Sequence, residues 1–261
     1  MMLLYRGPSR LDPSRRIIVA AVGYGAGGAA NSKTGSGMVQ IYIQAEPTPA
    51  VPTPALAARQ GGGDKGACGG CALQGIYAPS TDERIDGTRA CYVHLGQGPS
   101  QVAKTFLAGA YEDWTANTPS AVAAFFAGRG VRLGAYGDPA AIPIRLLRAL
   151  MRLAAFWTGY THSPERAPHL KPYVMASAHN PAHALALQAK GWRTFRISPA
   201  GDVARMPGEL LCPASKEAGR KLHCDQCQAC DGTAKGRRAN VMIPLHAGAR
   251  AAVRYAGVVG L

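Results

Sequence analysis

Short apolar runs alternate along the chain with segments whose apolar residues recur every three or four positions. The apolar runs predict strands at 17–22, 38–45, 90–95, 131–136, 156–161, 173–178, 193–198, 209–211 and 240–246. The helical periodicity predicts helices at 100–114, 118–127, 143–155 and 181–190. Ser100 and Pro143 suit helix starts, and Gly128 and Gly191 suit helix ends.

Repeated strand–helix–strand units predict an α/β fold with a mostly parallel sheet. The strand count fits a partial, TIM-like (β/α) barrel better than an open sheet. We expect an N-terminal β-hairpin and Pro/Gly-rich loop in residues 1–66, and the barrel core in residues 67–211. Residues 212–261 would form a cysteine-rich metal-binding segment and the last barrel strand.

Two glycine- and proline-rich stretches interrupt this pattern. The segment Asn31-Ser32-Lys33-Thr34-Gly35 resembles a phosphate-binding loop, but Ser32 stands where the motif needs glycine, so a turn is the better prediction. Residues 46–66 are rich in Pro, Ala and Gly and are expected to form an exposed loop or linker.

Composition narrows the functional classes. A hydrophobic content of 47% excludes a disordered chain, and no apolar stretch approaches the ~20 residues that span a bilayer. Without a signal peptide at the start, a cytoplasmic location is expected. Lys and Arg outnumber Asp and Glu by 29 to 15, giving a net charge of +14 that favours nucleic acid or phosphorylated partners. A GC-rich genome would produce the same excess, and no long Lys/Arg run is present.

Seven cysteines fall into two groups, which in a cytoplasmic chain indicates metal or redox chemistry. The second cysteine group is Cys212, Cys224, Cys227 and Cys230. Four thiolates satisfy tetrahedral zinc, and three closely spaced cysteines with a remote fourth also hold four-iron clusters. The consecutive C-x2-C-x2-C run favours the iron–sulfur cluster over zinc.

The first cysteine group is Cys68, Cys71 and Cys91, which lacks an obvious fourth ligand. An open coordination position lets a metal centre bind a substrate or cofactor. The alternative is a structural zinc site completed by His94. In the second group, His223 is a possible substitute ligand.

Polar residues gather at the predicted strand ends, where the loops of a (β/α) barrel place its chemistry. These residues are Asp138, Thr161, His162, Ser177, His179, Arg196, Ser198, Cys212 and His246. Each has a structural alternative: Asp138 would cap the following helix, and a lone histidine would be a hydrogen-bonded surface residue. His183, inside a helix, is expected to be solvated.

The order of these features resembles the radical S-adenosylmethionine enzymes. There, a loop after the first barrel strand supplies three cysteines to a four-iron cluster, and a Gly-rich motif after the second strand contacts the amino group of the cofactor. The resemblance implies that Cys68, Cys71 and Cys91 hold the catalytic cluster, and that Gly137 and Asp138 face the cofactor. Ser177 would contact its ribose or carboxylate, and the second cysteine group would hold an auxiliary cluster.

The cysteine spacing departs from that family, whose usual C-x3-C-x2-C motif is absent. The wide spacing resembles carbon–phosphorus lyase instead. The whole chain also resembles an uncharacterised cysteine-rich family of bacteriophages and plasmids, which implies a mobile-element setting. That likeness lies in residues 31–35 and in Tyr136-Gly137-Asp138-Pro139, Thr158-Gly159-Tyr160-Thr161-His162 and Cys212-Pro213-Ala214-Ser215-Lys216-Glu217.

The favoured hypothesis is an iron–sulfur enzyme with one or two four-iron clusters, S-adenosylmethionine and an external electron donor. Its nucleotide or nucleic-acid substrate would be held by Tyr136, His162, His179 and Arg196. One alternative is a zinc-braced basic protein that binds nucleic acid without catalysis. Another is a zinc-containing, transglycosylase-like base-modifying enzyme in which Asp138 is a nucleophile or base, although its usual zinc motif is absent.

Overall fold

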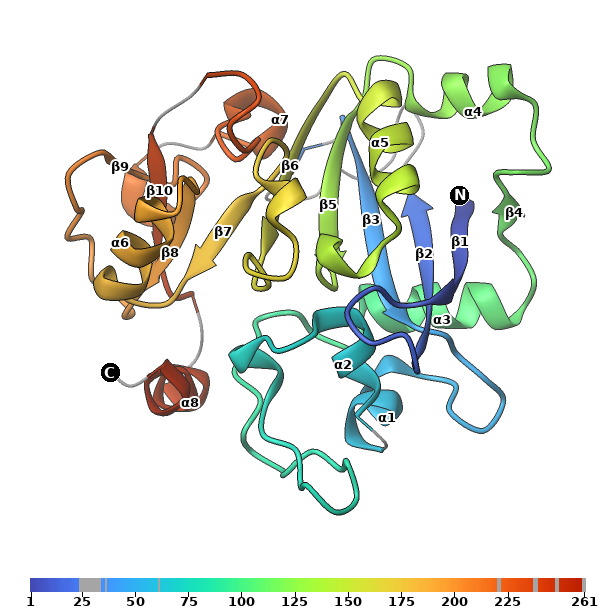
Figure 1. Cartoon of the computed structure of the whole chain (residues 1–261), viewed down its shortest axis with the longest axis horizontal. Helices are drawn as coiled ribbons and strands as arrows, with labels where there is room; N and C mark the ends of the chain where they lie inside the picture. The colour runs from blue at the N-terminus through green and yellow to red at the C-terminus, as the bar shows by residue number, and fades with distance from the viewer. Residues whose placement is uncertain are drawn as a thin grey trace.

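A computed structural model describes residues 1–23, 34–35, 37–60, 62–219, 222–236, 239–246 and 249–259 (Figure 1). Its strands are β1 (Met2–Pro8), β2 (Arg16–Val22), β3 (Met38–Ala45), β4 (Glu112–Asp113), β5 (Gly130–Tyr136), β6 (Phe156–Thr161), β7 (Met175–Ala178), β8 (Thr194–Ser198), β9 (Glu209–Leu211) and β10 (Asn240–Pro244). Its α-helices are α1 (Pro54–Arg59), α2 (Gly63–Cys68), α3 (Gly98–Leu107), α4 (Pro119–Phe126), α5 (Ile144–Leu153), α6 (Pro181–Ala189), α7 (Cys224–Cys227) and α8 (Ala249–Val259). Short 3-10 turns are η1 (Ala72–Gln74), η2 (Pro139–Ala141), η3 (Pro168–Leu170) and η4 (Lys216–Ala218).

The strands form one ten-stranded sheet in the order β4-β1-β2-β3-β5-β6-β7-β8-β10-β9. β1, β2 and β3 pair antiparallel, whereas each neighbouring pair from β3 to β10 is parallel. The six strands β3, β5, β6, β7, β8 and β10 therefore follow one another in space as they do along the chain. All three of the expected segments, 1–66, 67–211 and 212–261, contribute strands to this sheet.

The sheet is not closed, because β4 and β9 form its two edges. The α/β class and the mostly parallel sheet are thus confirmed. The expected partial (β/α) barrel is not confirmed by this open sheet and stays a prediction. A parallel crossover is almost always right-handed, so strands that step in one direction place their connecting helices on one face. Figure 1 shows α5 and α6 on the same side of the sheet.

The main core fills the space between those helices and the sheet. Leu147 and Leu150 of α5 pack there with Val131 and Leu133 of β5, and Leu187 of α6 joins the same cluster. The smaller clusters contain the cysteines. One of them includes Met175 of β7, Phe195 of β8 and Val241 of β10. The helices therefore cover one face and the cysteine-bearing segments approach the other.

The repeated strand–helix units were predicted well. The strands expected at 38–45, 156–161 and 209–211 have those bounds, and the other strands beyond residue 130 agree within two residues. Thr118 caps α4 and Asn180 caps α6 through their side chains. The expected helix at 100–114 ends at Leu107, and Ser100 lies inside it, donating a hydrogen bond to the Leu95 carbonyl.

Three expectations for the first hundred residues were wrong or incomplete. No strand forms at 90–95, a stretch that the structure describes in full. β1 was not predicted. Residues 54–59 form α1 rather than an exposed linker, and Ala57 and Ala58 are buried. In the phosphate-loop-like segment, Asn31, Ser32 and Lys33 lie outside the described residues.

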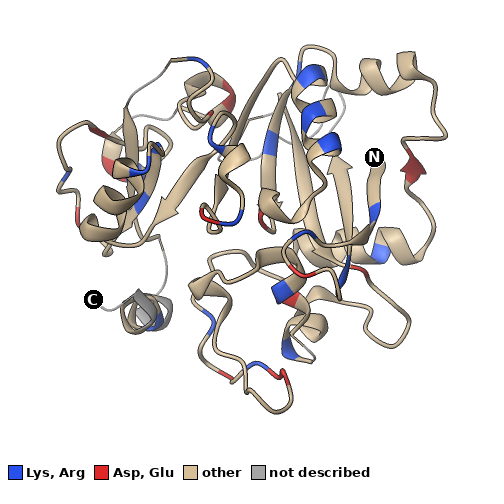
Figure 2. Cartoon of the chain, viewed as in Figure 1, with Lys and Arg blue, Asp and Glu red and all other residues tan. Residues whose placement is uncertain are grey.

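Charged residues are spread over the molecule (Figure 2). A row of basic residues marks α5, where Arg145, Arg148 and Arg152 are exposed. Their spacing places them along one side of the helix. In the described part of the chain, no helix is long and apolar enough to cross a bilayer.

Candidate metal centres and the chamber between them

The face of the sheet opposite α5 and α6 carries the candidate site. Successive side chains of a strand point to opposite faces, so every second residue shares a face. Residues in this phase line adjoining cavities: Arg132, Gly134 and Tyr136 of β5, Thr158 and Tyr160 of β6, Ser177 of β7, Phe195 and Ile197 of β8, and Ile243 of β10. One face of the sheet therefore supplies the floor of the site.

The first cysteine group surrounds a cavity of about 80 Å³. Cys68 ends α2, and Cys71 follows it after one tight turn in which its backbone N–H donates to the Cys68 carbonyl. Cys91 is brought alongside because its N–H donates to the carbonyl of Leu73 at 2.8 Å. Gly137, Asp138, Ser177 and His162 line the same cavity. The structure thus brings together the three thiols and most of the residues predicted to bind a cofactor.

Burial disfavours the charged form of these thiols. It raises the pKa of Cys68 well above its usual range and that of Cys71 to about 12. Thiols in such an environment stay protonated unless a cation replaces the proton. A metal centre would supply that charge.

The end of β5 is tied directly to the first cysteine group. The backbone N–H of Asp138 donates to the carbonyl of Ala67 at 2.8 Å, next to Cys68. The Tyr136 hydroxyl donates to the buried carboxylate of Asp64. These two contacts fix α2, and with it Cys68, against the carboxyl end of the strand.

Gly137 has a conformational reason to be glycine. Its φ is +83°, and a Cβ there would lie 2.2 Å from the carbonyl oxygen of Ile43. The chain therefore passes very close to β3 at this point. A substituent would push the β5 end, and the cavity wall that it forms, away from β3.

The Asp138 carboxylate has three donors. Oδ1 accepts the N–H of Ala140 at 2.9 Å, which caps η2. Oδ2 accepts the N–H of His162 at 2.7 Å and the Thr161 hydroxyl at 3.1 Å. Burial raises the pKa of the Asp138 carboxyl, while these hydrogen bonds and His162 oppose the rise. The capping alternative is therefore present, and the same carboxylate joins the ends of β5 and β6.

The second cysteine group surrounds a smaller cavity of about 20 Å³ that all four residues line. Cys224 and Cys227 lie three residues apart on α7 and so share a side of the helix. Gln228 has a φ of +50°, which ends the helix and turns the chain so that Cys230 returns. Cys212 follows β9, and its N–H donates to Met242 of β10.

Arg193 fastens the segment that carries Cys230. Its guanidinium pairs with the buried Asp231 at 3.0 Å and donates to three backbone carbonyls between residues 229 and 239. The N–H of Gly159 also donates to the Cys230 carbonyl. Burial raises the pKa of the Cys230 thiol above its usual range and that of Cys224 to about 11.

The thiols of each group share a cavity rather than converging on one point. In the part of the chain that the structure describes, no three His, Cys, Asp or Glu side chains are close enough to hold a single metal ion. Bound zinc would need its sulfurs about 2.3 Å from the ion. An iron–sulfur cluster is a larger body of several irons and sulfides, so its thiolates lie further apart.

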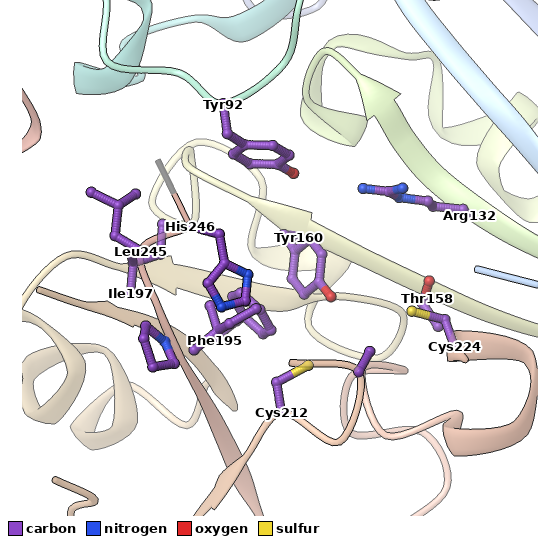
Figure 3. Close-up of a pocket in the computed structure, with 13 residues that line it drawn as sticks. Tyr92, Arg132, Thr158, Tyr160, Phe195, Ile197, Cys212, Cys224, Leu245 and His246 are labelled. Carbon is purple, nitrogen blue, oxygen red and sulfur yellow. The ribbon is translucent and has the colours of Figure 1, made fainter. Parts of the chain in front are cut away.

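A third cavity, of about 110 Å³, connects the two groups (Figure 3). We call it the chamber. It shares Tyr92, Tyr160, Phe195 and Ile197 with the first cavity, and it shares Tyr160, Cys212 and Cys224 with the second. Tyr160 lines all three. The chamber therefore lies between the two cysteine groups.

Other predicted residues lie outside these cavities. Arg196 points to the opposite face, where it pairs with Glu209 through two bonds of 2.8 and 2.7 Å. His94 is exposed and His223 caps α7, and neither lines a cysteine cavity. His179 stacks on His162 with ring centroids 5.4 Å apart but does not line the first cavity.

Cys212, Cys224 and His246 of the chamber were predicted to belong to a site, but Tyr92, Arg132, Tyr160 and Phe195 were not. These four were treated as parts of predicted strands, and Tyr160 also as part of a segment that carries the likeness to the bacteriophage and plasmid family. A signal was present, because Arg132 and Tyr160 are in phase with Tyr136 and His162 along their strands. A charged residue within a predicted buried strand indicates a site on that face.

Comparisons with family models, curated proteins and solved structures found no match to this chain.

Proposed function

We propose that the chain is an iron–sulfur enzyme of the radical S-adenosylmethionine type that acts on a nucleotide or nucleic-acid substrate. The observation that carries the proposal is the first cavity. The buried Cys71 and the partly buried Cys68 and Cys91 share it with Gly137, Asp138 and Ser177. Three protein ligands leave one position of a four-iron cluster open for the cofactor.

The sheet supports this proposal. Its six parallel strands follow each other in chain order, as they do in a partial (β/α) barrel, and the first cysteine group lies in the connection that follows β3. In such folds the site lies at the carboxyl ends of the strands. Gly137, Asp138 and His162 all follow strand ends. The partial barrel is accordingly part of the proposal.

The cluster and S-adenosylmethionine would together supply one-electron radical chemistry for hydrogen abstraction, with the electron coming from an external donor. The residues of the chain bind and orient. Cys68, Cys71 and Cys91 hold the cluster, and the Asp138 N–H bond to Ala67 keeps Cys68 in place. Tyr160 and Phe195, with ring centroids 4.3 Å apart, form an aromatic part of the chamber floor.

The second cysteine group would hold an auxiliary cluster, with zinc as the alternative. The four thiols satisfy either centre. In the cluster case, the chamber would lie between two iron–sulfur centres. In the zinc case, the same residues brace the edge of the sheet formed by β10 and β9.

The decisive variants are Cys68→Ala and His162→Ala. His162 lines the first cavity, and its Nε2 is buried without a hydrogen-bond partner. A Cys3His zinc site in this cavity would therefore use His162, after the side chains had moved closer together than they lie in this structure. We expect Cys68→Ala to lose iron and reductive cleavage of S-adenosylmethionine, while His162→Ala keeps its iron. Loss of one zinc ion from both variants, with no cofactor cleavage in the wild type, would reject the proposal.

A second candidate function is the zinc-braced nucleic-acid-binding protein. The observation that favours it is the row of exposed arginines, Arg145, Arg148 and Arg152, on α5. Phosphate contacts make affinity fall steeply with salt, by a slope of about 0.9 per phosphate contact on duplex DNA. Replacing these arginines with glutamine would then reduce the slope of duplex binding against salt. An unchanged slope would reject this candidate.

A further inference from the structure

The chamber has one charged corner. Arg132, at the middle of β5, lines it, and Figure 3 shows the guanidinium pointing into the space beside Tyr92 and Tyr160. Tyr92 is 46% exposed and lies at the chamber's edge, whereas Tyr160 lies on its floor. The Tyr92 hydroxyl is hydrogen-bonded to Arg132 and the Tyr160 hydroxyl to Cys230, so the remaining N–H groups of the guanidinium are the donors that this corner offers to a ligand.

Arg132 has no acidic partner in the described part of the chain. The groups that raise the pKa of its guanidinium against the effect of burial are Tyr92, Tyr160, Cys224 and Tyr42. Two buried arginines differ in this respect: Arg193 pairs with Asp231, and Arg196 pairs with Glu209. A partly buried cation without a carboxylate is costly unless an anion joins it.

The remaining wall of the chamber is apolar. Phe195 and Ile197 come from β8, Ile243 from β10, and Leu245 from the segment that follows β10. The rings of Phe195 and Tyr160 both line this space, with centroids 4.3 Å apart. Such a surface favours a flat, unsaturated group that can stack on the rings. His246 at the rim is already paired with Glu217 at 2.8 Å.

We propose that the chamber binds a planar unsaturated molecule with one oxyanion, a carboxylate or a phosphate monoester, and that Arg132 holds the oxyanion while Phe195 and Tyr160 hold the plane. This inference rests on the proposed function in taking the chamber as the substrate site. It narrows the substrate class to ligands small enough for the chamber. A nucleoside monophosphate fits the phosphate case, with its base on the aromatic wall.

Arg132 also lies near Cys224, which gives it a second possible use. Its positive charge lowers the pKa of the Cys224 thiol, although burial has the larger, opposite effect. If Arg132 served only to neutralise a metal centre in the second cysteine group, its removal would reduce metal content and leave ligand binding unchanged. The two uses therefore predict different measurements.

The test uses the full chain, purified without oxygen and with its bound metal. Benzoate and phenyl phosphate are the anionic probes, and benzyl alcohol is the neutral control, with binding followed by ligand-observed NMR and calorimetry. We expect saturable binding of at least one anionic probe and much weaker binding of benzyl alcohol. Which anion binds more tightly distinguishes a carboxylate from a phosphate ligand.

Arg132→Gln is expected to weaken the anionic probe about tenfold to a hundredfold, the range for charge-assisted hydrogen bonds. Arg205→Gln, at an exposed arginine outside the chamber, is the matched control and should bind as the wild type does. If Arg132→Gln does not fold, Arg132→Lys keeps the charge but not the paired donors, and should weaken binding to a smaller extent.

Three results would overturn the inference. The wild type would bind neither anion, benzyl alcohol would bind equally well, or Arg132→Gln would lose metal while its loaded fraction bound the anion unchanged. Failure of the proposed function is separate, because it appears as absent iron and no response to S-adenosylmethionine. A chain that responds to the cofactor but ignores both anions would refute this inference alone.

Discussion

Asp138 shows how one residue can organise the site without contacting a substrate. Its carboxylate accepts hydrogen bonds from Ala140, Thr161 and His162, and its N–H donates to Ala67. The same residue therefore caps η2, joins β5 to β6 and positions the segment that ends in Cys68. This arrangement leaves little capacity for the nucleophilic role of the transglycosylase-like alternative, which we do not propose.

Asp138→Ala leaves buried donors without an acceptor, so we expect it to lower the free energy of unfolding by about 2–4 kcal/mol. The matched control is Asp113→Ala. Asp113 accepts the N–H and hydroxyl of Thr115 in an exposed turn, where water can replace it, so the cost should stay below about 1 kcal/mol. Urea unfolding measures both. Equal losses would show that Asp138 contributes no more than a surface cap.

At the scale of elements, Arg193 is expected to stabilise the fold by more than its ion pair alone would, because it also donates hydrogen bonds to backbone carbonyls. It joins the start of β8 to the loop that carries Cys230. Arg193→Met leaves Asp231 buried without its main cation, which typically costs about 3–5 kcal/mol. We expect faster amide exchange between residues 229 and 236 and less metal in the second cysteine group.

Lys235→Met is the control for that variant. Lys235 approaches the same Asp231 carboxylate, but at 3.9 Å and from a side chain that is 36% exposed. Solvent screens such a pair, so its removal should cost less than about 1 kcal/mol and leave the metal content unchanged. If both variants lost metal equally, the hydrogen bonds of Arg193 to the backbone would not be what holds the loop.

The elements that could be predicted are those whose pattern is local. β3 and β6 are continuous apolar runs bounded by turn residues, and α4 and α6 begin with a side-chain cap and a proline. β1 was missed because Arg6 and Pro8 interrupt its apolar residues, although it pairs with β2 over its length. α1 was missed because its small alanines, which are buried against other segments, resemble a linker in composition.

The grouping of each cysteine set followed from spacing alone, but the chamber did not. Spacing along the chain indicates which thiols can meet. It does not indicate that Tyr160 lines the cavities of both groups, because that depends on the face of the sheet over which each cysteine-bearing loop passes. The polar strand ends were a partial guide: Asp138, His162 and Ser177 line the first cavity, whereas Arg196 faces the other way.

At the scale of the whole molecule, three adjacent histidines predict an acid-sensitive fold. His179 packs between His162 and His183, with centroid distances of 5.4 and 5.5 Å. Burial, followed by the neighbouring His162 and His183, lowers the pKa of His179 to about 3. The pKa values of His162 and His183 are also lowered, chiefly by burial.

An unfolded chain protonates histidine below about pH 6.5, whereas the folded state keeps His179 neutral down to much lower pH. The unfolded state therefore binds more protons, and stability should fall as the pH drops from 6.5 towards 3. The slope is about 1.4 kcal/mol per pH unit for each such proton. In urea unfolding at pH 7, 6 and 5, His179→Gln should reduce the slope and His94→Gln, at an exposed site, should not. An unchanged slope in His179→Gln would contradict this account.

The central claim is that the two cysteine groups hold iron–sulfur clusters, and a metal count of the protein purified without oxygen tests it most directly. Iron, acid-labile sulfide and zinc would be measured per chain, together with the visible spectrum. The account predicts a brown protein with about seven to eight irons and a similar amount of sulfide, as two four-iron clusters require. A colourless protein with about one or two zinc ions and no sulfide would contradict it.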